Sequence, residues 1–437
     1  MLETKQRINM PDLVKELFPE GYALLPGTNQ VYELEFALGE YRSLSLSELV
    51  ARSAYFHKVN GQETNHYRIC ADSALHMDES SSARLKSFFQ VYRFKTSYAT
   101  HGLFPYRGKF HPQLIKAIMN LMGLQKGETV LDPMMGSGTT NIEASLIGIN
   151  SIGIDASPFC RLMAQTKIDA MDIDLKEFLE CAKNPTEIFD YYNSKVKQRS
   201  LITEEKEVAC SFTKDSELYN LFLLCYLDAV GYARRRKNKH PKELFPIVLQ
   251  RYVQALTNFL TIKSKLGLKL GKATIIEGDA RDLRNLDADK IKTIGDETIE
   301  GIITSPPYSF AIDYVESDRL QLEYMGYDIK DLRNRMIGLR GSGLKNQVQN
   351  YLSDMDTTAE EMSRVLRKGK YCTIIIGSNT TQLERALAGL GIKLEDELVK
   401  ISERHGMTLN KRVIRPIEGI RNSMKTESIL FFQNENH

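Results

Sequence analysis

The sequence predicts an α/β protein with a Rossmann-like parallel sheet, a helical insertion within it and an extension at its N-terminus. Three observations favour this class. A strand, glycine-rich turn, helix and second strand occupy about 30 residues up to Asp155, and such a βαβ unit implies a parallel sheet with a right-handed crossover. Apolar strands resume after residue 273, and residues 173–267 between them repeat with a helical period.

The βαβ unit follows a predicted helix over 111–124, in which Leu114, Ile118 and Leu121 recur at helical spacing. The unit itself comprises a strand at 129–132, a helix at 140–149 and a strand at 151–155. After residue 272 the sequence predicts strands at 273–280, 300–308, 371–377 and 428–433, and helices near 357–367 and 380–389.

The N-terminal part carries weaker patterns, with a short β-like piece at Val31–Leu34 and helical stretches near 45–56. We expect four segments along the chain. They are an N-terminal domain of uncertain fold at 1–95, a first half of the α/β domain at 96–172, a helical insertion at 173–267 and a second half of the α/β domain at 268–437.

Composition excludes several classes. The chain has 437 residues, 42% of them hydrophobic and 26% charged, which is ordinary for a globular protein and excludes collagen, coiled-coil rods and general disorder. Its net charge of +2 gives no field over the whole chain that would indicate a nucleic-acid partner. The six cysteines form no C-x-x-C pair, and no apolar run reaches the roughly 18 residues that a membrane span needs. We therefore expect a cytoplasmic protein with no metal site and no membrane segment.

The first motif is DPMMGSGTT, which runs from Asp132 at the end of a strand into Gly136 and Gly138. Glycines at such a turn let backbone N–H groups and a helix N-terminus approach a ligand. The motif is not a phosphate-binding Walker A loop, because no lysine precedes its Ser or Thr, and Asn141 replaces the third glycine of the dinucleotide fingerprint. Asp155, at the end of the next strand, is typical of a ribose-binding acid. The alternative is an ordinary glycine-containing turn.

The second motif is Thr304-Ser305-Pro306-Pro307-Tyr308, at the end of an apolar strand. Two prolines cannot continue a β-ladder, so the chain leaves the sheet at the edge where such folds bind ligands. A serine before the prolines and an aromatic ring after them suit a planar ring that carries an exocyclic amine. The alternative is a rigid loop that closes the sheet.

DPMMGSGTT followed by TSPPY resembles the paired motifs of the DNA amino-methyltransferases that use S-adenosyl-L-methionine (AdoMet) and methylate exocyclic nitrogens of cytosine or adenine. GLFPYRGKFHPQLIKAI (102–118), GDARDL (278–283) and RVLRKGKYCTIIIG (364–377) also resemble motifs of this family. The resemblance covers about 100–172 and 273–433. It implies AdoMet as cofactor and double-stranded DNA as substrate, with a cognate restriction endonuclease as a further candidate partner.

The resemblance also implies roles for individual residues. The implied cofactor-binding residues are Phe110, His111 and Pro112 at the methionine end, Asp132, Pro133, Gly136, Ser137, Gly138 and Thr139 around the glycine loop, Asp155 at the ribose and Asp279 at the adenine. The implied catalytic residues are Ser305, Pro306, Pro307 and Tyr308.

The chemistry of the second motif agrees with this implication. Acceptors at Ser305 Oγ and the Pro306 carbonyl would orient the amine for in-line transfer, and Tyr308 would stack on a base that has left the duplex. The serine resembles the cytosine-N4 branch, so we favour cytosine N4 over adenine N6. A methyltransferase of structured RNA and a non-catalytic nucleic-acid-binding protein stay open as alternatives.

Two basic stretches are candidates for phosphate contact. Residues 234–272 contain eleven Lys and Arg residues against Glu243 alone. A solvated helix face is the usual explanation of such a run, but phosphate contact is favoured here. A second stretch after TSPPY could form a loop that closes on DNA. The predicted nucleic-acid-binding residues are Arg234, Arg235, Arg236 and Lys237 in the first stretch and Arg333, Arg335 and Arg340 in the second.

Overall fold

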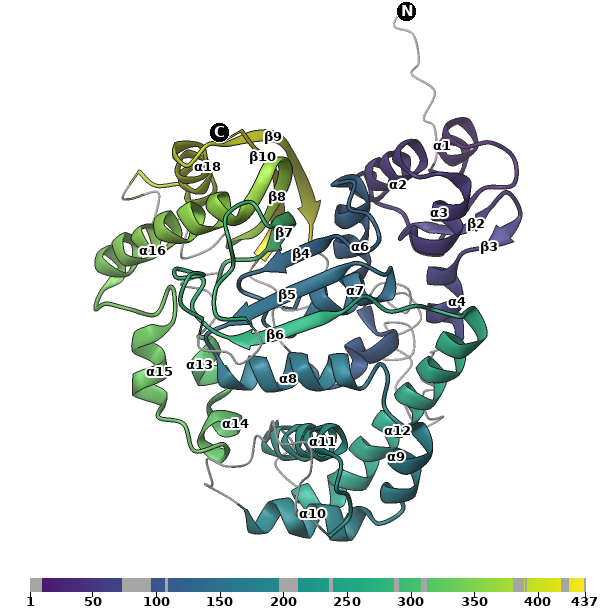
Figure 1. Cartoon of the computed structure of the whole chain (residues 1–437), viewed down its shortest axis with the longest axis vertical. Coiled ribbons are helices and arrows are strands. Elements are labelled where there is room, and N and C mark those ends of the chain that lie inside the picture. The colour runs from purple at the N-terminus through teal and green to yellow at the C-terminus, as the bar shows by residue number, and fades with distance from the viewer. Residues whose placement is uncertain are drawn as a thin grey trace, which may run out of the picture.

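The computed structural model describes residues 10–72, 96–106, 109–195, 211–235, 239–286, 291–307, 313–379, 389, 391–417 and 424–435. Its centre is a seven-stranded sheet in the order β6-β5-β4-β7-β8-β10-β9 (Figure 1). The strands are β4 Thr129–Asp132, β5 Asn150–Asp155, β6 Ala273–Glu277, β7 Ile299–Thr304, β8 Leu366–Asn379, β9 Met407–Pro416 and β10 Met424–Asn434. The first five strands in this order, β6, β5, β4, β7 and β8, are parallel. Strand β10 runs antiparallel to both β8 and β9. The predicted Rossmann-like α/β class is confirmed.

Successive side chains of the central strands serve opposite faces of this sheet, as the pleat requires. Val130 and Ile303 belong to the core formed with α2 (Val31–Ser43) and α6 (Pro112–Leu121). Their neighbours Leu131 and Ile302 belong to the core formed with α16 (Leu344–Val365) and α18 (Leu394–Arg404). Because both faces are covered, these strands read as continuous apolar runs in the sequence.

The N-terminal part consists of helices around a small antiparallel sheet of order β1-β2-β3. Its elements are α1 Met10–Leu17, β1 Ala23–Leu24, α2, α3 Leu46–Arg52, β2 Phe56–Val59, β3 Gln62–Glu63 and α4 Asn65–Asp72. Its apolar side chains, Phe36 and Tyr55 among them, share one core with Ile115 and Ile118 of α6. The described residues 10–72 are therefore packed on the central domain through a continuous core.

The β-like reading of Val31–Leu34 is wrong, because these residues form the first turn of α2. The Glu33 carboxylate accepts hydrogen bonds from the backbone N–H groups of Asn29 and Gln30, at 2.8 and 3.1 Å. This capping interaction fixes the start of the helix and outweighs the β-propensity of Val31 and Tyr32.

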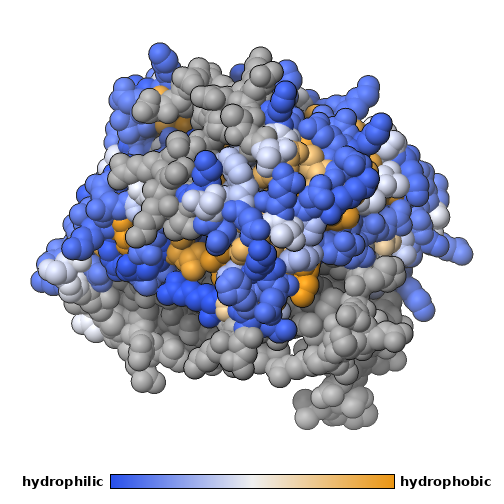
Figure 2. Space-filling view, turned by 90° about the horizontal axis from the view of Figure 1, so that it is seen from below, coloured by the Kyte–Doolittle hydropathy of each residue, from blue (hydrophilic) through white to orange (hydrophobic). Residues whose placement is uncertain are grey.

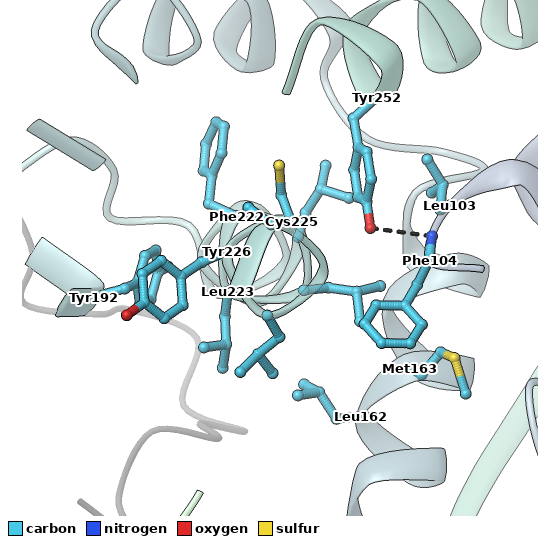
Figure 3. Packing of buried hydrophobic residues seen from close by; sticks show 14 of the residues in the cluster. Leu103, Phe104, Leu162, Met163, Tyr192, Phe222, Leu223, Cys225, Tyr226 and Tyr252 are labelled. Atoms are coloured by element: carbon cyan, nitrogen blue, oxygen red, sulfur yellow. Dashed lines mark hydrogen bonds between the residues drawn. The ribbon is translucent and has the colours of Figure 1, made fainter. Parts of the chain in front are cut away.

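Helices occupy the segment between α8 (Pro158–Asp169) and β6. They are α9 Leu175–Cys181, α10 Pro185–Ser194, α11 Ser216–Arg235 and α12 Pro241–Leu266. Figure 3 shows apolar side chains of α11, such as Phe222 and Leu223, in one cluster with Leu162 of α8. In the same view the Phe104 backbone N–H donates to the Tyr252 hydroxyl of α12 at 3.1 Å. These helices are thus joined to the sheet domain through the core around α8.

The structure differs from the expected elements at β9 and at the start of α16, and one expected helix is not tested. Strand β9 was missed, because its polar residues, such as Asn410 to Arg412, give no apolar run at a sheet edge. Helix α16 begins at Leu344, well before the expected 357. The helix expected at 380–389 lies outside the described residues except for Gly389.

The face seen from below, toward α10 to α12, is largely hydrophilic in its described part and carries only small separated apolar patches (Figure 2). Ile247 on α12 is an exposed apolar side chain. Within the described part of the chain, no helix has the length and apolar character to cross a membrane.

Candidate functional site

The glycine loop joins β4 to α7 (Thr139–Leu146) and depends on two left-handed backbone positions. Gly136 has φ 51° and Gly138 has φ 76°. A Cβ atom at Gly138 would lie 2.8 Å from the Cβ and 3.2 Å from the Cα of Ala164 in α8. Only glycine satisfies both the backbone conformation and this close helix approach. The loop is therefore held tightly between α7 and α8, with α7 beginning directly after it.

Asp132 lies beneath this loop and points into the protein. It is fully buried, and its carboxylate accepts from Thr140 Oγ1 at 2.6 Å and from the Met134 backbone N–H at 3.2 Å. Burial raises the pKa of Asp132 to about 7, against the lowering effect of these hydrogen bonds. Asp132 is not among the residues that line the pocket described below. Its position supports a role in fixing the loop.

Asp155 ends β5 and faces the same loop. Its Oδ2 accepts from the Gly136 backbone N–H at 2.9 Å, and its Oδ1 accepts from the Ser157 N–H at 2.8 Å. Burial raises the pKa of this carboxyl to about 6. The sheet register thus places a carboxylate beside the glycine loop, as the sequence predicted.

Asp279 follows β6 and is anchored by Arg281. The Arg281 Nε donates to Asp279 at 2.9 and 3.1 Å, Nη1 donates to Asp354 at 2.8 Å, and Nη2 donates to the Arg335 carbonyl at 2.9 Å. The hydrogen bonds that Arg281 donates to Asp279 raise the pKa of the guanidinium. One guanidinium therefore ties the loop after β6 to the segment around Arg335.

A single pocket collects most of the predicted cofactor and catalytic positions at the carboxyl ends of the parallel strands. Predicted residues that line it are Phe110, Pro133, Gly136, Ser137, Thr139, Asp155, Asp279, Ser305 and Pro307. Gly138 lies behind the loop against α8, Pro112 is buried in the first turn of α6, and His111 is the N-cap of that helix. Pro306 is buried and Tyr308 lies outside the described residues.

The outer wall of this pocket comes from the segment after the Pro-Pro motif. That segment contains α13 Tyr314–Ser317, α14 Arg319–Tyr324 and α15 Ile329–Arg335. Tyr314, Val315 and Asp318 line the pocket from its start, and Met336 and Ile337 line it from its end. The motifs did not indicate this wall, because its residues are adjacent only in the folded chain.

Other lining residues were also missed by the sequence analysis, among them Tyr106, Lys109 and Cys160. Tyr106 and Lys109 lie within the segment that resembled a family motif, and Cys160 lies in the first turn of α8. The Tyr106 hydroxyl lies 3.4 Å from Cys160 Sγ and donates to Asp318 Oδ2 at 3.3 Å. Lys109 Nζ donates to the carbonyls of Thr96 and His101, so its charge is directed at the backbone.

One residue of each predicted basic stretch affects Glu316 electrostatically. The pKa of this carboxyl is lowered mainly by a hydrogen bond from Arg319, and Arg234 and Arg333 add to the effect. Arg234 is exposed at the end of α11, and Arg333 pairs with Asp313 at 2.5 Å. Residues distant in sequence therefore place basic groups together beside the segment that walls the pocket.

The other predicted basic residues are placed differently. Arg333 and Arg335 lie in helix α15, so this part of the expected loop is helical. Arg340 pairs with the buried Asp354, which also binds Arg281, and Arg335 pairs with Asp331 at 3.5 Å. Arg236, Lys237 and the side chain of Arg235 lie outside the described part of the chain.

Comparison with known proteins identifies methyltransferase relatives. A family model described as "RMKL-like, methyltransferase domain" matches residues 103–199. The Type II methyltransferase M.BsoBI of Geobacillus stearothermophilus is 24% identical over 371 residues, which cover 75% of this chain and 70% of that protein. The Type II methyltransferase M.MjaII of Methanocaldococcus jannaschii is 26% identical over 328 residues, which cover 72% of this chain and 57% of that protein.

A shorter similarity involves an RNA enzyme. The tRNA (guanine(10)-N2)-dimethyltransferase of Methanothermobacter thermautotrophicus is 40% identical over 52 residues, or 12% of this chain and 16% of that protein. Together with the Type II relatives, it confirms the methyltransferase resemblance that the two motifs indicated. The pocket fits AdoMet, the cofactor that the resemblance implies: acids stand at three strand or helix ends around a glycine loop, which suits a ligand with hydroxyl, amine and cationic groups.

Proposed function

We propose that this relative of the Type II methyltransferases transfers a methyl group from AdoMet to an exocyclic amine of a base in double-stranded DNA, with cytosine N4 as the acceptor. One observation carries the proposal. Ser305 and Pro307 of the Pro-Pro motif line the same pocket as Gly136 and Asp155 of the cofactor motifs. A methyl donor and an acceptor amine bound by these two groups would be neighbours, as direct transfer requires.

The acceptor side supplies orientation and electrostatic stabilisation. An exocyclic amine is a poor nucleophile because its lone pair is delocalised into the ring. Ser305 Oγ and the Pro306 carbonyl would accept its two N–H groups and favour positive charge on nitrogen as the bond forms. Tyr308 would stack on the flipped base. AdoMet supplies an activated methyl group when bound.

The cofactor side divides the ligand among the strand ends. Asp155 would accept from the ribose hydroxyls and Asp279 from the adenine amine. Phe110 would pack on the methionine end together with His111 and Pro112. The remaining cofactor residues act around the loop: Pro133, Gly136, Ser137 and Thr139 at the ligand, and Asp132 and Gly138 by fixing the loop between β4, α7 and α8.

The basic groups around Glu316 support DNA as the substrate. Arg333 lies within the segment that forms the outer wall of the pocket, and Arg234 lies close enough to affect Glu316 of that segment. Phosphates of a duplex would approach a base that enters the pocket there. We extend the proposal to Arg235, Arg236 and Lys237, which follow Arg234 directly in the sequence.

RNA is the second candidate substrate, because the short similarity to the tRNA enzyme concerns a protein named for an exocyclic guanine amine. The test is incubation with radiolabelled AdoMet and, separately, unmodified duplex DNA and total unmodified tRNA. We expect label in DNA at least ten times that in tRNA at equal nucleotide concentration. Label in tRNA alone would replace the proposal with the RNA alternative, and label in neither would favour a non-catalytic binder.

A cognate restriction endonuclease is part of the proposal through the Type II relatives. DNA methylated by the protein should then resist one endonuclease that cuts the same DNA before treatment. Cleavage unchanged across a panel of endonucleases would remove this partner from the proposal without affecting methyl transfer.

A further inference from the structure

Asp318 is a buried carboxylate in the cofactor pocket to which no motif assigned a role. It stands between α13 and α14 and is 7% exposed. Its Oδ2 accepts from the Tyr106 hydroxyl at 3.3 Å, and its side chain lines the same pocket as Gly136 and Asp155. Burying a carboxylate is costly unless a partner compensates its charge.

The described cations of the pocket do not supply that partner. Lys109 directs its ammonium at the Thr96 and His101 carbonyls, and Arg335 pairs with Asp331. Among the described residues, no Lys, Arg or His forms an ion pair with Asp318. Burial raises the pKa of Asp318 to about 7, and the nearby Asp155 carboxylate adds to this effect. A positively charged ligand would therefore compensate two neighbouring acids at once.

Tyr106 indicates which end of the cofactor Asp318 meets. It belongs to the segment 102–118, whose family resemblance places it at the methionine end, and its ring lies 3.8 Å from where a Cβ of Gly136 would be. Asp155 and Asp279 are already occupied with ribose and adenine in the proposed function. The methionine end carries an ammonium group, which is a hydrogen-bond donor that a carboxylate binds strongly.

We propose that Asp318 binds the α-ammonium group of AdoMet and that the Tyr106 hydroxyl orients its carboxylate. This inference rests on the proposed function, since it assumes that the pocket holds AdoMet. It also gives the segment after the Pro-Pro motif a direct part in cofactor binding: the outer wall closes on the amino-acid end of the ligand.

The test compares two probes in calorimetry on the full chain. S-adenosylhomocysteine carries the amino-acid end, whereas 5′-methylthioadenosine keeps the adenosine and sulfur but lacks that end. In Asp318→Asn we expect affinity for S-adenosylhomocysteine to fall about 10- to 100-fold, as for loss of a charge-assisted hydrogen bond, with 5′-methylthioadenosine unchanged within about two-fold. Tyr106→Phe should show the same selectivity with a smaller loss.

The matched control is Glu316→Gln, which removes an exposed carboxylate two residues earlier and should leave both affinities unchanged. If Asp318→Asn does not fold, Asp318→Glu tests the same contact by displacing the charge, with the same selective loss expected. An equal loss for both probes, or none for either, would overturn the role of Asp318. Wild-type protein that binds neither probe would instead overturn the cofactor assignment of the pocket.

Discussion

The cofactor pocket and the basic surface, which comprises Arg234, Arg319 and Arg333 beside Glu316, are built by different physical means. In the pocket, Asp155 and Asp279 follow parallel strands, so the sheet itself brings them to one edge. On the basic surface, the net charge depends on long side chains and on the acidic residues that the fold places beside them. The local sequence predicts the backbone register, whereas the pairing of charges depends on the whole fold.

The segment 234–272 shows what this difference means. Glu243 is the one acidic residue of this segment in the sequence. In the structure, acidic residues from outside the segment pair with several of its basic residues. Lys242 pairs with Asp190 at 2.7 Å, and Arg251 pairs with the buried Asp228. Lys263 likewise pairs with Asp172. The run is therefore not one free basic face, and the proposed role of Arg234 rests on its place near Glu316 of the pocket wall.

The largest effect expected in the pocket comes from Gly138→Ala. The new Cβ would lie 2.8 Å from the Ala164 Cβ, and the alanine would have to keep the left-handed backbone φ of 76°. We expect binding of S-adenosylhomocysteine and methyl transfer both to be lost. Gly123→Ala is the control, because Gly123 has φ 71° but open space around its Cβ position. That variant should lose about 1–2 kcal/mol of unfolding free energy and keep its ligand affinity. Equal behaviour of the two variants would show that the approach of α7 to α8 is unimportant.

Ser305→Ala should separate transfer from cofactor binding. Removing an acceptor that acts on the amine should lower the methylation rate about 100- to 1000-fold. Affinity for S-adenosylhomocysteine, measured by calorimetry, should change little, because the glycine loop and the acids stay in place. A rate within a few-fold of wild type would remove Ser305 from the catalytic group.

Cofactor affinity should depend on pH through the two raised acids of the pocket. Below their pKa values, about 6 for Asp155 and about 7 for Asp318, these carboxyls are neutral and attract the α-ammonium group of the ligand less. We therefore expect affinity for S-adenosylhomocysteine to rise about 10-fold from pH 5 to pH 7, and the rise should be smaller in Asp318→Asn. A pH-independent affinity would show that neither carboxylate meets the ligand's charge.

Buried carboxyls with raised pKa values should affect the stability of the fold with the opposite sign to their effect on ligand affinity. A carboxyl whose pKa is raised in the folded state binds more protons there than in the unfolded state, so its contribution to stability is lost as pH rises from about 4 to 7. Asp132, with its pKa raised to about 7, contributes to this loss. Asp132→Asn should flatten the fall of melting temperature over that range. An unchanged slope in calorimetric melts would indicate that Asp132 is not buried as a carboxyl.

The smallest effect should come from the basic surface. Arg234→Glu should weaken duplex binding several-fold. It should also reduce the slope of log affinity against log salt concentration by the contribution of about one phosphate contact. Lys269→Glu makes the same charge change on an exposed residue just before β6, at the amino end of the strands and away from the pocket. Duplex affinity, measured by fluorescence anisotropy across a salt series, should be the same for this control as for the wild-type protein. Equal losses in both variants would point to a diffuse charge effect.

The sequence predicted the pocket better than the rest of the site because its signals are local. Gly136, Asp155 and Ser305 each follow a recognisable strand, and parallel pairing then brings them together. The outer wall had no such signal: Asp318 and Met336 come from short helices whose place is decided by packing.

The same distinction applies to the fold. The buried parallel strands were predicted from their apolar runs, whereas the polar edge strand β9 was missed. Glu33 capped a helix where β-branched and aromatic residues favoured a strand. Arg340, predicted to meet phosphate, is paired with Asp354 from α16, an acid that only the folded structure places beside it.

The identity of the methylated nucleoside tests most directly whether the protein methylates cytosine N4 in DNA. Unmodified duplex DNA is incubated with the protein and AdoMet, digested to nucleosides and analysed by mass spectrometry. We expect N4-methylcytosine, formed about 100- to 1000-fold more slowly when Ser305→Ala replaces the wild-type protein. N6-methyladenine would keep the exocyclic amine and change the base, whereas 5-methylcytosine or no methylated nucleoside would overturn the proposed transfer to an exocyclic amine.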